Sequence, residues 1–366
     1  MSKDVKLSAD GQQVLDESLA LAVESGRVPG IVGMLGVDGE SLWSAVAGDM
    51  GPGAPMRSDV IMPLASVGKM YTATAVMLLL EAGALSVEDP VSDFIPEFDS
   101  VMVSVNENLV APASPVTVHH LLTHTGGLMV DGDLFWEAWN AHSGKTTTGH
   151  LARALAELPL QSHPGSAFAY GATGASYEVL GAIVEVVSGQ TLEEFMEERI
   201  FRPLGLEDSH FFVPEDKLDR LAALFRRSDG TFALERQLGE DRPRSGFFHG
   251  GGGIQASGTD LLRFGELFVN GGQVDEMRLL EARTVETMMR DHVGDLLPIE
   301  GLGWGYGAAI KTATGRYGWV GGGHAKAWID PALQLVAYFG FPLMPPGEPV
   351  LLEELEHLVD QHLLVT

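Results

Sequence analysis

Strand-like segments lie at both ends of the chain, and a long stretch with a mainly helical pattern lies between them. Near the N-terminus, two β-like runs at 31–37 and 41–46 are joined by Asp38-Gly39, a dipeptide typical of a tight hairpin. From about 89 to 244 the apolar residues recur at helical spacing. Strand patterns then return at 253–256, 306–311, 315–320, 326–329 and 335–341. We therefore predict one antiparallel sheet that both ends of the chain complete, interrupted by a helical insertion.

The predicted fold class is α+β, an antiparallel sheet flanked by helices with an inserted all-α lobe. A length of 366 residues exceeds the usual size of a single domain, so two closely packed parts are expected. We predict a sheet domain made of 1–88 together with 245–366, a mainly helical lobe at 89–244, and an active site between them. The individual helices are expected at 9–25, 66–82, 151–158, 174–188, 192–200 and 350–364.

The charge balance excludes several kinds of partner. Asp and Glu (50) outnumber Lys and Arg (23), which gives a net charge of −27. Such a charge repels nucleic acid and anionic membrane surfaces, and we interpret it as a solvated acidic surface.

The absence of cysteine excludes disulfides, thiolate catalysis and cysteine-ligated zinc. No apolar signal segment follows Met1, and no apolar run approaches the ~20 residues of a membrane span. We expect a soluble, cytoplasmic protein.

Ser66-Val67-Gly68-Lys69 forms an S-x-x-K box at the start of the helix expected at 66–82. On a helix this spacing puts both side chains on one face. A serine hydroxyl is a poor nucleophile until a base takes its proton, and a lysine in apolar surroundings can be that base. The helix N-terminus would stabilise negative charge that develops at the serine. Taken alone, the box is equally compatible with a helix-capping serine and an unrelated lysine, so its context decides.

Further motifs accompany the box in a fixed order along nearly the whole chain. They are Pro63-Leu64-Ala65-Ser66-Val67-Gly68-Lys69, Val116-Thr117-Val118-His119-His120-Leu121-Leu122-Thr123-His124-Thr125-Gly126-Gly127-Leu128, Pro164-Gly165 before Tyr170, Leu180-Gly181 after it, Phe201-Arg202-Pro203-Leu204-Gly205-Leu206, Gly250-Gly251-Gly252-Gly253 and Gly303-Trp304-Gly305-Tyr306-Gly307. On these motifs the chain resembles the family of serine β-lactamases and penicillin-binding proteins of the class C type, which includes the family VIII carboxylesterases. The resemblance implies the β-lactamase/DD-peptidase-like fold.

The resemblance also implies a second catalytic element, Y-x-N, which corresponds to Tyr170-Gly171-Ala172. A phenol near a lysine ammonium can carry protons between the nucleophile and the leaving group. Tyr170 is therefore the expected partner of Ser66 and Lys69. The third residue departs from the pattern, because Ala172 cannot hydrogen-bond a substrate amide as the family's asparagine does.

The third family element, K-T-G or H-x-G, corresponds to Trp319-Val320-Gly321. Trp319 carries no charge to bind the carboxylate of a β-lactam or a peptide terminus, and W-x-G is similar to the pattern of the esterase branch. We expect Ala172, Trp319, Val320 and Gly321 to contact the substrate. By the same correspondence, the backbone N–H groups of Ser66 and Gly322 would form the oxyanion hole.

Several other residues could suggest a different chemistry. His120 and His124 have i, i+4 spacing, but without an H-E-x-x-H motif we do not expect a metal site. His249 and His324 flank glycine-rich segments and could lie at the edge of the cleft, but they are interpreted as surface or supporting residues, and the mechanism needs neither. Lys311-Thr312-Ala313 imitates K-T-G but lacks the glycine. An α/β-hydrolase triad is disfavoured because no G-x-S-x-G surrounds Ser66. The aromatic residues that could line an acyl pocket are Trp136, Trp139, Phe211, Phe212, Phe247, Phe248 and Trp304.

The expected function is carboxylic ester hydrolysis through an acyl-enzyme on Ser66, with Lys69 and Tyr170 moving protons and no cofactor required. Which of the two is the primary base is left open. The alternative is a β-lactamase or D-Ala-D-Ala carboxypeptidase, and less favoured readings are an acyltransferase or a non-catalytic binding module of the same fold. The expected partner is a small-molecule ester, and a homo-oligomer is compatible with the sequence.

Overall fold

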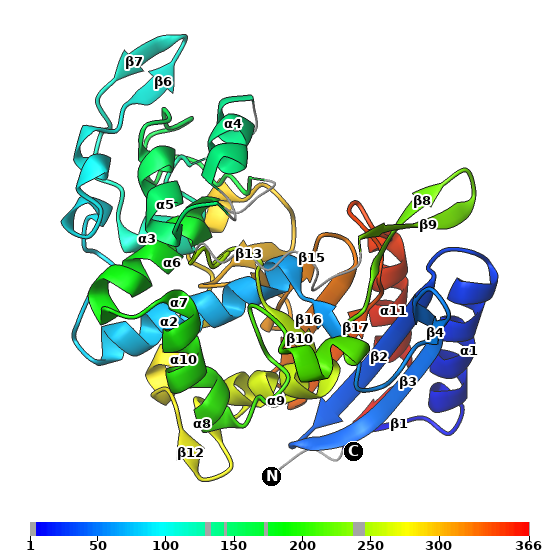
Figure 1. Ribbon diagram of the computed structural model, residues 1–366. Helices are drawn as coiled ribbons and strands as arrows, with labels where there is room; N and C mark the ends of the chain where they lie inside the picture. The colour runs from blue at the N-terminus through cyan, green and yellow to red at the C-terminus, as the bar shows by residue number, and fades with distance from the viewer. Residues whose placement is uncertain (1–4, 129–132, 143–144, 172–174, 237–245, 366) are drawn as a thin grey trace.

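The computed structural model describes residues 5–128, 133–142, 145–171, 175–236 and 246–365 (Figure 1). Its main sheet has eight strands, each antiparallel to its neighbours, in the order β13-β14-β15-β16-β17-β2-β3-β4. The strands from the N-terminal part are β2 (Gly30–Val37), β3 (Glu40–Gly51) and β4 (Ala54–Pro55). Those from the C-terminal part are β13 (Leu302–Trp304), β14 (Ala309–Lys311), β15 (Arg316–Gly321), β16 (Ala325–Asp330) and β17 (Leu335–Gly340).

The pairing of β17 with β2 joins the two ends of the chain in one sheet. Leu335 lies opposite Val37 and Gly340 opposite Val32. Every residue of β17 is buried, because the sheet is covered on both faces at this point. The antiparallel α+β fold predicted from the sequence is confirmed.

Helices cover both faces of the sheet (Figure 1). On one face, α1 and α11 pack on alternate residues of β17 such as Ala337 and Phe339. On the other face, α9 packs against Val336 and Tyr338. The described helices are α1 (Gly11–Glu24), α2 (Lys69–Glu81), α3 (Val118–Leu122), α4 (Asp133–His142), α5 (Thr148–Ala156), α6 (Ala175–Ser188), α7 (Leu192–Met196), α8 (Arg202–Leu204), α9 (Gly258–Val269), α10 (Ala282–Met288) and α11 (Pro349–His362).

The segment at 89–244 carries α3 to α8 and two hairpins that project from the molecule (Figure 1). Its helices share one apolar core with the buried α2. Because that core is continuous with the face of the sheet under α9, the division into a sheet domain and a helical lobe stays a prediction. The hairpins are β6 (Val103–Val105) with β7 (Asn108–Val110), and β8 (Leu224–Ser228) with β9 (Thr231–Arg236).

Some predicted element boundaries are wrong. The helix expected from Ser66 is preceded by a 3₁₀ turn at Ala65–Gly68, and α2 begins only at Lys69. The helix expected at 192–200 is α up to Met196 and continues as a π turn at Glu197–Phe201.

Two errors concern strands, and both involve short pairings between distant segments. The strand expected at 253–256 is β10 (Gln255–Ser257), which pairs with β5 (Ile61–Pro63) outside the main sheet. The final helix ends at His362, and β18 (Leu363–Val365) then pairs with β1 (Val5–Leu7). Such pairs leave little periodic signal in the sequence.

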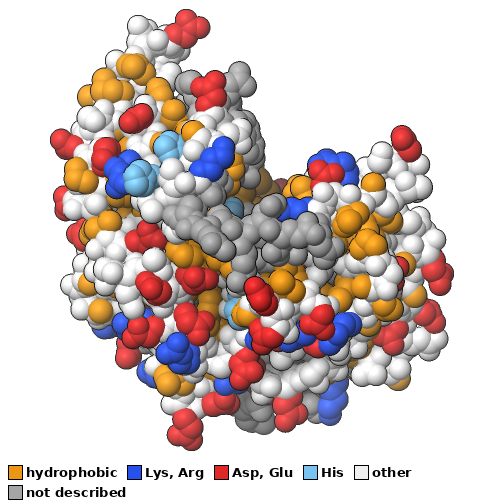
Figure 2. All heavy atoms as spheres, viewed as in Figure 1, with side chains coloured by type: hydrophobic (Ala, Val, Ile, Leu, Met, Phe, Trp, Pro, Cys, Tyr) orange, Lys and Arg blue, Asp and Glu red, His pale blue; other side chains and the backbone are white. Residues whose placement is uncertain are grey.

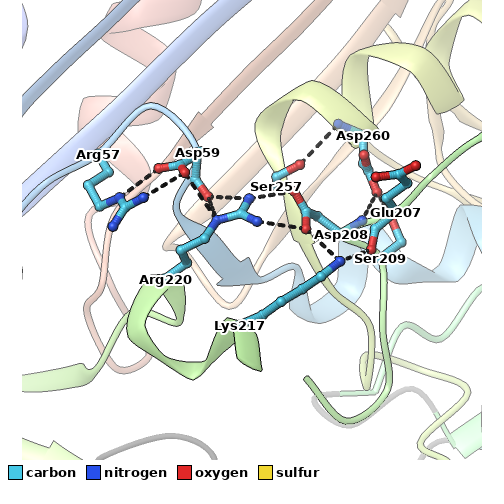
Figure 3. Close-up of polar contacts among 9 residues, drawn as sticks. All are labelled: Arg57, Asp59, Glu207, Asp208, Ser209, Lys217, Arg220, Ser257 and Asp260. Atoms are coloured by element: carbon cyan, nitrogen blue, oxygen red, sulfur yellow. Dashed lines mark hydrogen bonds and ion pairs between the residues drawn. The ribbon is translucent and has the colours of Figure 1, made fainter. Parts of the chain in front are cut away.

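A network of charged and polar side chains ties three parts of the chain together beside β5 (Figure 3). Arg220 donates to the backbone oxygen of Asp59 at 3.0 Å and to the carboxylate of Asp208. Asp260 of α9 accepts from the backbone N–H of Asp208 at 2.7 Å and from Ser209 Oγ at 2.9 Å. The network therefore links the loop before β5, the end of the helical segment and α9.

Acidic side chains are spread over the face shown in Figure 2, with Lys and Arg among them. No helix among the described residues is both long and apolar enough to cross a membrane.

Candidate active site

Ser66 lies in a tight turn where three backbone segments meet. The residue before it, Ala65, has a left-handed φ of 45°, an uncommon conformation for alanine and a form of backbone strain. Strand β15 passes so close that a Cβ on Gly321 would lie 2.1 Å from the Leu64 carbonyl oxygen. Glycine at 321 is therefore required for the turn and the strand to touch.

The side chains of Ser66 and Lys69 are in direct contact. Lys69 Nζ donates to Ser66 Oγ at 2.8 Å and to the carbonyl oxygen of Gly251 at 2.7 Å. Lys69 is only 1 % exposed, whereas Ser66 is half-buried and reachable. The 3₁₀ turn brings residues i and i+3 to one side, as the predicted α-helix would have done.

Aromatic rings surround the lysine. Its Nζ lies 5.3 Å from the ring centre of Tyr170 and 5.7 Å from that of Tyr177, distances at which an ammonium interacts favourably with a ring face. Burial, together with the nearby charge of Lys69, lowers the pKa of His124 well below its ordinary value. The histidine is thus neutral and adds no positive charge next to Lys69.

Tyr170 is positioned by a backbone hydrogen bond of the preceding residue and by contacts with three aromatic side chains. The backbone N–H of Ala169, its neighbour, donates to the His124 carbonyl at 2.9 Å. The Tyr170 ring packs against those of His124, Trp304 and Trp319 at centre distances of 4.7, 5.3 and 5.2 Å. Trp319 Nε1 donates a hydrogen bond to the Tyr170 oxygen at 2.8 Å. The first residue of W-x-G therefore holds the phenol directly.

A cavity of about 620 Å³ opens over Ser66. Trp319, Val320 and Gly322 form one wall, and Gly322 has a φ of +57°, which glycine adopts without strain. The described residues that line the cavity are Ala65, Ser66, Trp139, Tyr170, His249, Gly251, Gly252, Trp319, Val320, Gly322, Gly323, Pro345, Pro346 and Pro349.

A buried carboxylate fixes the glycine segment that faces Lys69. Glu178 of α6 is fully buried and accepts from the backbone N–H groups of Gly250 at 3.2 Å and Gly251 at 2.9 Å. It also contacts His249 Nδ1. On the other side, Thr72 Oγ1 donates to the Gly250 carbonyl at 2.7 Å. The carbonyl that accepts from Lys69 is thus held between α6 and α2.

Most residues that the sequence predicted for the site lie together. Ser66, Tyr170, Trp319, Val320 and Gly322 line the cavity. Lys69 lies behind Ser66, and Gly321 contacts the turn. Ala172 lies outside the described residues.

The aromatic residues predicted for an acyl pocket lie in different surroundings. Trp139 lines the cavity, whereas Trp304 is fully buried and packs on Tyr170. The side chain of Trp136 is outside the described part of the chain. The remaining residues, Phe211, Phe212, Phe247 and Phe248, belong to or pack against the main core.

Sequence reasoning missed Glu178, Tyr177 and the Gly251 carbonyl as neighbours of the site. Glu178 stands in an ordinary helical pattern, and its partners lie more than seventy positions later. The one available signal was a carboxylate within a strongly apolar helix.

The competing motifs have structural partners. His120 and Thr117 cap α3 through a reciprocal pair of hydrogen bonds. Lys311 forms an ion pair with Glu356 of α11. No group of three or more His, Cys, Asp or Glu side chains within the described ranges is arranged to hold a metal ion.

The chain is similar to known proteins over most of its length. A family model described as Beta-lactamase matches residues 13–358. Esterase EstB of Burkholderia gladioli is 31% identical, with 88% of each chain covered. Protein Rv1367c of Mycobacterium tuberculosis is 30% identical over 68% of this chain, and the match spans 63% of that relative's length. The solved structure of EstCE1, a hydrolase with promiscuous acyltransferase activity, has a TM-score of 0.81 at 23% identity and covers 96% of this chain and 98% of its own.

Proposed function

The chain belongs to the beta-lactamase family of serine hydrolases, and from that premise we propose that it is a carboxylesterase whose nucleophile is Ser66. The observation that carries the proposal is that Lys69 hydrogen-bonds Ser66 and that Tyr170 lines the same cavity as Ser66. The Tyr170 phenol accepts a hydrogen bond from Trp319. A nucleophile, a buried amine and a phenol beside one cavity are sufficient for acyl transfer to serine.

In the first step, the pair formed by Lys69 and Tyr170 takes the proton of Ser66 as Oγ attacks the ester carbonyl. The backbone N–H groups of Ser66 and Gly322 would stabilise the oxyanion. Tyr170 then gives its proton to the leaving alkoxide and regains one from Lys69. The alcohol departs and the acyl group remains on Ser66.

In the second step, water attacks the acyl-enzyme. Tyr170 and Lys69 take the proton of the water and return one to Ser66 Oγ, which releases the carboxylic acid. The Trp319 N–H supports this cycle, because a donor on the phenol oxygen stabilises negative charge that forms there.

The similarity to EstB supports an esterase. Trp319 argues against a β-lactamase or D-Ala-D-Ala carboxypeptidase, because an indole cannot form an ion pair with the carboxylate of a β-lactam or a peptide terminus. Acyl transfer to an alcohol in place of water would use the same acyl-enzyme, and the EstCE1 likeness makes it the second candidate.

The test compares wild type with Ser66→Ala on a p-nitrophenyl ester, a chromogenic cephalosporin and a D-Ala-D-Ala peptide. We expect the ester to be cleaved fastest, and cleavage to be lost in Ser66→Ala. Lys69→Ala and Tyr170→Phe should each lower activity by at least ~10²-fold. Equal ester cleavage by wild type and Ser66→Ala would refute the proposal.

A further inference from the structure

Among the described residues that line the cavity, His249 has no part in the proposed reaction. Among the described lining residues, the polar side chains are Ser66, Tyr170, the two indoles of Trp139 and Trp319, and His249. The Trp319 N–H is already bonded to Tyr170. His249 is thus the imidazole that the described wall offers to a bound molecule.

Glu178 fixes the orientation of this imidazole. The carboxylate contacts His249 Nδ1 through Oε1, which also accepts from the Gly251 N–H. Its other oxygen accepts from the Gly250 N–H. Because Glu178 is fully buried in α6 and every contact points at 249–251, the ring cannot turn without leaving a buried carboxylate short of a partner.

The rest of the ring is held by aromatic neighbours but is not covered. Trp139 meets it edge to face at 5.1 Å between ring centres, and Phe247 lies roughly parallel at 6.4 Å. The side chain still keeps 30% of its surface exposed. With Nδ1 on Glu178, Nε2 is the nitrogen left to hydrogen-bond a substrate.

The wall that carries His249 faces the acyl part of an ester in the proposed reaction. The carbonyl oxygen is directed to the N–H groups of Ser66 and Gly322, and the leaving oxygen must reach Tyr170, beside Trp319. We place the acyl chain in the remaining direction, toward Trp139 and His249, which line the same cavity.

We propose that His249, oriented by Glu178, binds a hydroxyl group on the acyl part of the substrate, so that the enzyme prefers hydroxyacyl esters to plain alkanoyl esters. The inference rests on the proposed ester hydrolysis and specifies its substrate class. A hydroxyl is both donor and acceptor, so it satisfies Nε2 whether the imidazole is neutral or protonated. A plain alkyl chain would cover that nitrogen without offering it a hydrogen-bond partner.

The experiment measures release of acid from three esters of matched size: ethyl butyrate, ethyl 3-hydroxybutyrate and 2-hydroxyethyl butyrate. For wild type we expect kcat/KM for ethyl 3-hydroxybutyrate to exceed that for ethyl butyrate by at least about tenfold. If the two kcat/KM values are equal, or if 2-hydroxyethyl butyrate has the highest value, the inference is wrong although the esterase proposal stands. If none is hydrolysed and a p-nitrophenyl ester is also untouched, the esterase proposal itself fails.

His249→Phe separates hydrogen bonding from packing, because phenylalanine keeps a ring against Trp139. The preference ratio, which is kcat/KM for ethyl 3-hydroxybutyrate divided by kcat/KM for ethyl butyrate, should fall about tenfold or more, to near one. His150→Phe, the same change at an exposed histidine of α5 outside the cavity lining, should leave the ratio as in wild type. A ratio unchanged in His249→Phe would overturn the inference. If that variant does not fold, the wild-type ratio alone decides.

Discussion

At the residue scale, the site depends on burying one positive and one negative charge near each other without direct contact. Lys69 and Glu178 are both essentially inaccessible, and the backbone of Gly251 lies between them. Its N–H faces the carboxylate and its carbonyl faces the ammonium. A buried charge is tolerated only with such partners, so the glycine segment is part of the electrostatic design of the site.

The hydrogen bond between Trp319 and Tyr170 can be removed with little change in shape. In Trp319→Phe the ring still packs on Tyr170, but the N–H is lost. We expect kcat for a p-nitrophenyl ester to fall by roughly 10- to 100-fold, the effect of one hydrogen bond to a group that carries charge. Steady-state kinetics with p-nitrophenyl butyrate measure it.

Trp328→Phe is the matched control, because Trp328 lies on the adjacent strand β16 and stacks on Phe339 in the core on the other face of the sheet. It should lose stability but keep kcat. If both variants retain kcat within about twofold, well below the loss expected for a charged hydrogen bond, the bond has no role in proton transfer.

The sequence predicted the residues of the cavity better than the residues that hold them. Ser66, Tyr170 and Trp319 stand in motifs whose order along the chain is informative. Glu178 does not, because its burial depends on a loop that only the folded chain brings to α6. The same holds for His249, whose ring is directed by that carboxylate.

At the element scale, strong periodicity predicted the long elements, and tertiary contacts set their ends. Strand β2 and helix α6 follow their patterns closely, whereas β3 continues to Gly51, beyond the predicted end at 46. The turn at Ser66 does not continue α2 backwards, because β15 and the strained Ala65 confine it. Local propensity could not indicate that constraint.

Helix α9 approaches the sheet through Gly265. A Cβ there would lie 2.4 Å from Val336 Cγ1 of β17. Although Gly→Ala normally favours a helix, we expect Gly265→Ala to lower the free energy of unfolding by about 1–3 kcal/mol through overpacking. Urea denaturation followed by circular dichroism measures it.

Gly149→Ala in α5 serves as the comparison, since its nearest neighbour would be the flexible Arg153 guanidinium at 3.6 Å. That variant should be neutral or slightly stabilised. A Gly265→Ala protein as stable as Gly149→Ala would mean that α9 shifts away from the sheet at no cost.

At the scale of the whole molecule, the network in Figure 3 joins segments far apart in the chain. Arg220→Met keeps the aliphatic stem but removes the bonds to Asp59 and Asp208. We expect a loss of about 2 kcal/mol, because a half-buried carboxylate and a carbonyl lose a charged donor. Arg57→Met removes exposed ion pairs with Asp59 and Asp219 and should therefore cost clearly less stability. Equal losses in urea denaturation would show that the link across segments adds nothing.

Two buried groups give the molecule opposing responses to acid. Burial, offset in part by the carbonyls of Pro63 and Gly322, lowers the pKa of His324 from 6.5 to about 4. The unfolded chain therefore binds this proton between pH 6.5 and 4, and stability falls as pH falls through that window.

Burial raises the pKa of Asp260 from 3.8 to about 6, despite its hydrogen bond from Ser209. Here the folded chain binds the proton, so stability rises as pH falls from 6 to 4.

The contribution of each group to the free energy of unfolding changes by about 3 kcal/mol over slightly more than two pH units. The two changes have opposite signs and nearly cancel between pH 6 and 4. Removing one should reveal the other. When the pH falls from 7 to 4.5, Asp260→Asn should lose more stability than wild type does, and His324→Gln should lose less. Urea denaturation of the three proteins at both pH values measures these differences, and the remaining titrations are common to all three. A shift of the same sign in both variants would contradict the opposing pKa directions, because only groups perturbed in opposite senses can compensate within one pH window.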